Sequence, residues 1–66
     1  MTIFLNGKET EVDESFTILD LVKQVKLPPE LVACELNLKI IKRSDYSSVK
    51  ISAGDRIEIL QMIGGG

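Results

Sequence analysis

The sequence contains no histidine and only one cysteine, Cys34. Histidine is the commonest general base and the commonest metal ligand in proteins, and a zinc site needs more than one thiolate where imidazole is missing. A single cysteine also excludes a disulfide within the chain and favours a reducing compartment. We therefore expect no catalytic side chains, no metal site and no disulfide scaffold.

Long apolar runs, an excess of one charge and phosphate-binding loops are also absent. No apolar run approaches the ~20 residues that span a bilayer, and the N-terminus does not read as a signal peptide. Ten acidic and 8 basic residues give a net charge of −2, which offers no patch for nucleic acid or an anionic membrane. Without a G-x-x-x-x-G-K-[ST] or G-x-G-x-x-G loop, no ATP or dinucleotide should bind to this chain. We predict a cytoplasmic, soluble protein with no cofactor of its own.

What the 66 residues do contain is the pattern of one small α+β domain. Thr17 reads as a helix N-cap with Asp20 in the first turn, Asn6-Gly7 as a type I′ hairpin turn, and Pro28-Pro29 as a helix stop. We expect a mixed sheet of four to five strands with one main helix packed across it. The predicted helix covers residues 18–25, and the predicted strands cover 2–5, 8–12, 31–36 (a central strand), 40–41 and 57–63, with turns at 37–39 and 52–55.

Several side chains have a possible chemical role and a simpler structural one. Cys34 could be a nucleophile, but it lies in an apolar run and free cysteines are usually buried, so we interpret it as a core residue. The carboxylates Glu9 and Glu11 read as the solvated face of a strand, as Asp13 and Glu14 read as a loop. The aromatic residues Phe16 and Tyr46 are predicted at the core or its edge, and Lys42-Arg43 in a solvated loop.

The C-terminal residues are harder to explain by folding alone. Residues 1–62 account for the predicted domain, and residues 63–66 (Ile63-Gly64-Gly65-Gly66) are expected to form an exposed, flexible tail. A glycine end costs conformational entropy and buries nothing, but it can lie extended in a narrow channel because glycine has no Cβ. If Ile57 and Ile59 face the helix, Leu60 and Met62 face outward beside this tail. We therefore take Leu60, Met62 and Ile63 as candidates for partner contact.

These features occur together in a known family. The stretches I-F-L-N-G-K, T-I-L-D-L-V, V-A-C-E-L-N with I-I-K-R-S-D-Y, and S-A-G-D-R-I-E-I-L-Q-M-I-G-G-G resemble the bacterial sulfur carrier proteins of thiamine biosynthesis, which have the ubiquitin-like β-grasp fold. The resemblance runs over the whole chain. Cys34 departs from it, standing where an aliphatic residue is usual. Lys42 stands where proline is common.

The resemblance implies a role in which partner enzymes act on the chain. A ubiquitin-activating-like adenylyltransferase would use ATP to adenylate the carboxylate of Gly66, and sulfur delivered from cysteine by a desulfurase would convert it to a thiocarboxylate. Thiazole synthase would then take the sulfur. In this scheme Gly66 is the covalent attachment point, Gly64 and Gly65 give access to the partner's channel, and the chain is a cosubstrate, not an enzyme.

Two alternatives remain open at this stage. One is a sulfur carrier for molybdopterin, cysteine or methionine biosynthesis, whose tail chemistry would be identical. The other is a ubiquitin-like module for protein conjugation or interaction, without sulfur chemistry.

Overall fold

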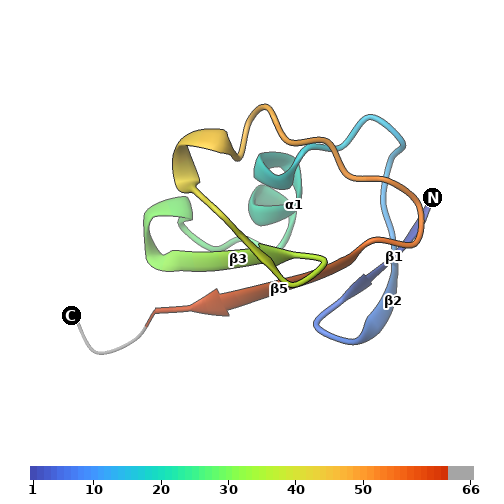
Figure 1. Ribbon diagram of the computed structural model, residues 1–66, viewed down its shortest axis with the longest axis horizontal. Coiled ribbons are helices and arrows are strands. Elements are labelled where there is room, and N and C mark those ends of the chain that lie inside the picture. Colours follow the sequence, from blue (N-terminus) through green and yellow to red (C-terminus); the bar gives the residue numbers. More distant parts are fainter. Residues whose placement is uncertain (63–66) are drawn as a thin grey trace.

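A five-stranded mixed sheet and one α-helix make up the fold (Figure 1), and the computed structural model describes residues 1–62. The strand order is β2-β1-β5-β3-β4; β1 and β5 run parallel, and the other neighbouring pairs are antiparallel. This confirms the predicted α+β class and the order of elements. The elements are β1 (Thr2–Leu5), β2 (Lys8–Glu11), α1 (Ile18–Gln24), β3 (Val32–Leu36), β4 (Lys39–Ile41) and β5 (Arg56–Gln61), with 3₁₀ turns at Pro29–Leu31 and Arg43–Asp45.

Helix α1 begins where the sequence predicts. Thr17 accepts a hydrogen bond from the backbone N–H of Asp20 (3.2 Å), and the Asp20 carboxylate accepts one from the backbone N–H of Thr17 (2.9 Å). This reciprocal capping box pairs two donors that would otherwise lack partners at the helix start. The apolar stripe Ile18, Leu21 and Val22 is fully buried against the sheet, so the helix is held mainly by its packing.

Strand β5 is the middle strand of the sheet, and β3 lies next to it. Residues 31–36 are predicted as a central strand, and β3 is paired on both sides, with β5 and with β4. Leu31 is not part of β3, because Pro28 (φ −66°) and Pro29 lead into a 3₁₀ turn in which the Leu31 N–H donates to the Pro28 carbonyl (2.9 Å). The central strand is the one that leads directly to the C-terminal residues.

The Asn6-Gly7 turn confirms its prediction and also ties the first hairpin to β5. Both residues have positive φ angles, 51° and 81°, as a type I′ turn requires. The Asn6 side chain then bonds both backbone groups of Ile59: its carbonyl oxygen accepts from the Ile59 N–H (2.9 Å), and its amide donates to the Ile59 carbonyl (3.3 Å). The Asn6 side chain therefore hydrogen-bonds the backbone of β5 beyond Ile57, where the pairing of β1 with β5 ends.

The second hairpin turn has the same geometry but an unusual residue. The residues with positive φ are Asn37 (51°) and Leu38 (73°), and Lys39 already belongs to β4, so the predicted 37–39 turn is shorter than expected. The Asn37 side chain accepts from the Arg56 N–H (2.9 Å), which fixes this turn to β5 as Asn6 fixes the first. Leu38 is 88% exposed. A leucine in the left-handed region is strained, and its exposure means that little burial compensates for the strain.

We expect Leu38→Gly to stabilise the protein by about 1 kcal/mol, because glycine adopts a positive φ without steric cost. Urea unfolding should show a higher midpoint with an unchanged slope. The matched control is Gly7→Leu, which places leucine at the equivalent position of the first hairpin. An added Cβ at Gly7 has no neighbour within 4 Å, so a loss of stability of about the same size would come from the backbone conformation alone. No gain for Leu38→Gly would contradict the strain at this turn.

Candidate docking surface

The alternation of side chains along β5 sets the candidate site. Ile57 and Ile59 are buried on the side of α1, whereas Leu60 and Met62 are 56% and 55% exposed. The alternation of the sequence predicts this orientation, and the structure confirms it. The structure thus places two of the three candidate contact residues on one exposed face; Ile63 lies outside the described residues.

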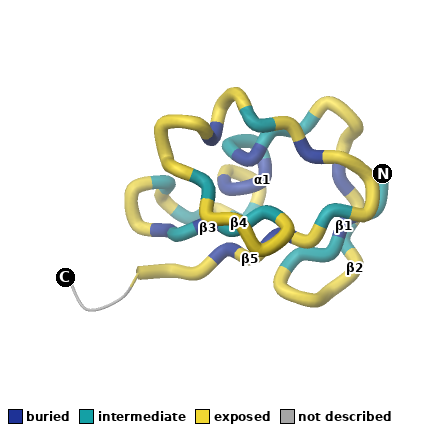
Figure 2. Tube along the Cα trace, in the orientation of Figure 1, coloured by how far each residue is buried: buried dark blue, intermediate teal, exposed yellow. Residues whose placement is uncertain are grey.

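The sheet face opposite α1, called the outer face below, is uncovered within residues 1–62. In Figure 1 the helix and the long connections lie on one side of β3 and β5, and in Figure 2 the buried segments cluster toward α1 while the run of β5 toward the C-terminus is exposed. Register and alternation place a mixed row of residues on the outer face. They are Phe4, Ala33, Glu35, Ile40, Arg56, Glu58 and Leu60.

Apolar side chains lie at the C-terminal end of this face. Leu60 is opposite Ala33 across β5 and β3, and the small alanine leaves the leucine side chain standing free. Met62 is held close to the chain that enters β3, because its N–H donates to the Leu31 carbonyl (2.7 Å). Leu31 is itself 46% exposed. Leu31, Leu60 and Met62 therefore form an apolar patch where the described part of the chain ends, and we call it the C-terminal patch.

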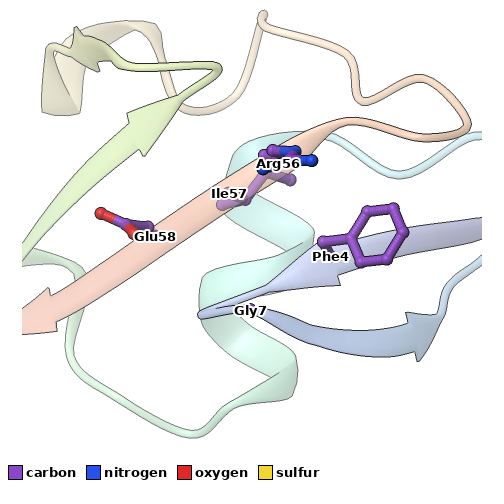
Figure 3. Close-up of a pocket in the computed structure, with 5 residues that line it drawn as sticks. All are labelled: Phe4, Gly7, Arg56, Ile57 and Glu58. Carbon is purple, nitrogen blue, oxygen red and sulfur yellow. The ribbon is translucent and has the colours of Figure 1, made fainter.

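A hollow of about 310 Å³ lies farther along the same sheet, between β1 and β5. Phe4, Gly7, Arg56, Ile57 and Glu58 line it (Figure 3). The Arg56 guanidinium lies over the Phe4 ring, 5.9 Å from the centroid, which is a cation–π distance. In Figure 3 the Glu58 carboxylate points away from Arg56. The sequence alone does not predict this hollow, because the hollow depends on the pairing of β1 with a strand from the other end of the chain.

Cys34 belongs to the core, as predicted. It is fully buried in β3, where it pairs with Ile59 of β5 and Ile41 of β4. Burial, with a smaller contribution from the Glu35 charge, raises the pKa of its thiol from 9.0 to about 11. The thiolate is the nucleophilic form of cysteine, so a buried thiol with this pKa is poorly suited to be a nucleophile at neutral pH.

We expect the Cys34 thiol to resist iodoacetamide in the folded protein and to react once urea unfolds the chain. Its raised pKa also predicts the sign of a pH effect. Folding favours the neutral thiol, so this contribution is intact below pH 9 and is lost as pH rises toward about 11. Cys34→Val should remove that loss of stability. Urea unfolding of wild type and Cys34→Val is measured over the same pH range, and the difference in stability between the two proteins gives the effect of the thiol without the effects of Tyr46 and the lysines. Identical alkaline behaviour of both proteins would contradict the assignment.

The other candidate side chains have the structural roles that the sequence predicts. Glu9 and Glu11 are exposed on β2, and hydrogen bonding by the Thr2 hydroxyl lowers the pKa of Glu11. Tyr46 is buried and Phe16 half-buried against the core. The remaining candidates, Asp13, Glu14, Lys42 and Arg43, are exposed.

Some functional expectations fall on residues that the structure does not describe. Ile63, Gly64, Gly65 and Gly66, including the predicted attachment point, lie outside residues 1–62. Within the described range, no group of three or more Asp, Glu or Cys residues is arranged to hold a metal ion. None of the helices in that range has the length and apolar character needed to cross a membrane.

Comparison with known proteins places this geometry in context. Residues 3–66 match the model of the ThiS family. The sulfur carrier protein ThiS of Bacillus subtilis (strain 168) is 36% identical over 63 residues, covering 94% of this chain and 96% of that protein. The crystal structure of the thiamine biosynthesis protein ThiS from Geobacter metallireducens superposes with a TM-score of 0.85 at 33% identity, covering 100% of both chains.

A second kind of relative is much longer. A thiazole synthase from Paramagnetospirillum magneticum (strain ATCC 700264 / AMB-1) is 36% identical over 66 residues, which are 100% of this chain but 20% of that protein. The thiazole synthase of Magnetococcus marinus (strain ATCC BAA-1437 / JCM 17883 / MC-1) is 35% identical over the same length, again 20% of that protein. The chain thus spans about a fifth of the length of these thiazole synthases.

Proposed function

The chain belongs to the ThiS family, and from this premise we propose that it carries sulfur for thiamine biosynthesis, in the assembly of the thiazole ring. The observation that supports the proposal most strongly is the near full-length match to a named sulfur carrier together with the superposition on a ThiS crystal structure. The fold is the ubiquitin-like β-grasp expected from the sequence. The family model extends to residue 66, so the glycine segment belongs to the match.

We further propose that Gly66 is the covalent attachment point. A carboxylate is a poor acyl donor, so a partner adenylyltransferase would join it to the α-phosphate of ATP and release pyrophosphate. Sulfide released by a thiol reductant from the persulfide of a cysteine desulfurase would then attack the acyl carbon and displace AMP, leaving a thiocarboxylate on Gly66. Gly64 and Gly65 would let the end enter the active site, because they carry no side chain.

Thiazole synthase is the proposed acceptor of the sulfur. The two long relatives that bear this name include a segment similar to the whole of this chain. A carrier joined to its acceptor in one polypeptide has a high effective concentration at the acceptor site. We take this as support for the same pairing between separate chains.

Intact-mass analysis tests the proposed chemistry. The chain is incubated with a ThiS-activating adenylyltransferase, ATP and a sulfide source, and we expect the mass gain of one oxygen-to-sulfur exchange on the C-terminal peptide. Omission of ATP is the control. Complementation of a thiazole auxotroph with the gene for this chain tests the pathway, and we expect growth to be restored. A carrier for molybdopterin, cysteine or methionine synthesis would acquire the sulfur without restoring growth. A protein-conjugation module would instead appear joined to lysines of other proteins.

A further inference from the structure

Two carboxylates lie opposite each other at the centre of the outer face. The register of β3 and β5 pairs Glu35 directly with Glu58. Side chains that are directly opposite in an antiparallel pair have Cβ atoms about 5 Å apart, and like charges in such a pair are unfavourable. Within residues 1–62, neither carboxylate accepts a side-chain hydrogen bond or forms an ion pair; the one ion pair there joins the N-terminus to Glu11. We call Glu35 and Glu58 the acidic pair.

The cation closest along the strand is already engaged elsewhere. Arg56 lies on the outer face two residues before Glu58, but its guanidinium is over the Phe4 ring (Figure 3). Folding of the chain therefore gains nothing evident from the acidic pair. A lysine or glutamine in place of either glutamate would remove the repulsion with no loss of buried apolar surface, because Glu58 is exposed and Glu35 only half-buried.

Apolar groups flank the acidic pair on two sides. Ile40 of β4 is opposite Glu35 and is 78% exposed, and Leu60 follows Glu58 along β5 on the same face. A partner that covers Ile40 and Leu60 must also cover the two carboxylates between them. Burying unpaired charges is costly, so that partner has to supply a positive group. A guanidinium or ammonium has several donors and can bond both carboxylates at once.

The short distance to the C-terminus restricts the partner to an enzyme that acts on Gly66. Four residues follow Met62, and a fully extended chain spans at most ~3.6 Å per residue, so Gly66 can reach no more than ~14 Å from the end of the described chain. An enzyme that encloses Gly66 in its active site must therefore lie against the end of β5. The C-terminal patch, Ile40 and the acidic pair form one continuous face leading back from that end.

Between the two enzymes proposed to act on Gly66, the synthase is favoured because two relatives named thiazole synthase include a segment similar to the whole of this chain. We propose that thiazole synthase docks on the outer face, and that an arginine or lysine of the synthase bridges Glu35 and Glu58. This inference rests on the proposed function and adds the chemistry of the contact. An isologous dimer of this chain centred on the pair is the less favourable occupant, because it would bring four carboxylates together.

The test measures affinity and stability on the same variants. Binding of the full chain to purified thiazole synthase is measured by calorimetry for wild type, Glu35→Gln, Glu58→Gln and Glu58→Lys. We expect each glutamine variant to bind about tenfold more weakly, as for loss of a charge-assisted hydrogen bond, and Glu58→Lys to bind more weakly still. Melting temperatures should be unchanged or higher, highest for Glu58→Lys, which places opposite charges across the strands. Glu14→Gln, in the loop before α1, is the matched control for net charge and should bind like wild type.

Four results would overturn the inference in distinguishable ways. If wild type binds and the variants at positions 35 and 58 bind within twofold of Glu14→Gln, the acidic pair is not in the contact. The same calorimetry is also done with the adenylyltransferase. If the variants at positions 35 and 58 lose affinity only for that enzyme, thiazole synthase is not the partner that contacts the acidic pair. If wild type does not bind the synthase at all, the choice of acceptor is wrong as well, whereas the mass assay for the thiocarboxylate still reports on the carrier function. A lower melting temperature of the glutamine variants would show that the pair serves the fold.

Discussion

Deletion of Gly66 is expected to leave the chain folded but unable to acquire sulfur. The proposed acceptor of the adenylate is the Gly66 carboxylate, and the shortened chain would present the carboxylate of Gly65 one residue earlier, which withdraws it by up to ~3.6 Å. A displacement of about 1 Å can already cost about a hundredfold in rate when reacting groups must be aligned. We therefore expect thiocarboxylate formation to fall by more than a hundredfold in the intact-mass assay.

The same variant should unfold like wild type, because the buried core residues within the described range, residues 1–62, lie between Ile3 and Ile59. The control is Glu14→Gln, an exposed substitution in the loop before α1 that leaves the C-terminal residues as they are; it should acquire sulfur like wild type. Sulfur acquisition by the deletion variant at a rate near that of wild type would show that Gly66 is not the attachment point. A lower urea midpoint would show that the last residue takes part in folding.

The parts of the fold that the sequence predicts well are those encoded within a few neighbouring residues. Asn6-Gly7 specifies a turn because both residues tolerate positive φ, and Thr17 with Asp20 specifies a helix start because the two side chains reach each other's backbone. Alternation along β5 likewise separates buried Ile57 and Ile59 from exposed Leu60. Each of these signals can be read without knowing what lies beside it.

The parts that the sequence does not predict depend on which strands meet. Glu35 and Glu58 become a pair only through the register of β3 on β5, and Phe4 meets Arg56 only through the parallel pairing of β1 with β5. Leu38 is a different case, because its left-handed conformation contradicts its own preference. There the pairing of β3 with β4 fixes the length of the turn, and the backbone of Leu38 has to adopt the positive φ that this turn requires.

Exposed residues that the fold does not need are therefore the best guide to the surface that contacts a partner. Among them, Leu60 gives the clearest test of this surface. Leu60→Glu should weaken binding to the adenylyltransferase by about thirtyfold or more, the loss expected when a central apolar contact is removed. Half of the Leu60 surface is already exposed in the free chain, so the stability of the chain should change little. Leu60→Ala separates the two causes: it loses the apolar contact without burying a charge, so it should bind more weakly than wild type but more tightly than Leu60→Glu.

The control for this prediction is Leu38→Glu, which introduces the same charge at an exposed leucine that follows β3, at the end of the β3–β5 ladder far from Leu60. Because Gly66 can reach only ~14 Å beyond Met62, an adenylyltransferase that encloses it has to contact the C-terminal patch, whereas it need not reach Leu38. Surface plasmon resonance with the immobilised enzyme should therefore show wild-type affinity for Leu38→Glu and a faster dissociation rate for Leu60→Glu. Equal losses for both variants would mean that added negative charge alone repels the enzyme, and equal affinities would remove Leu60 from the contact.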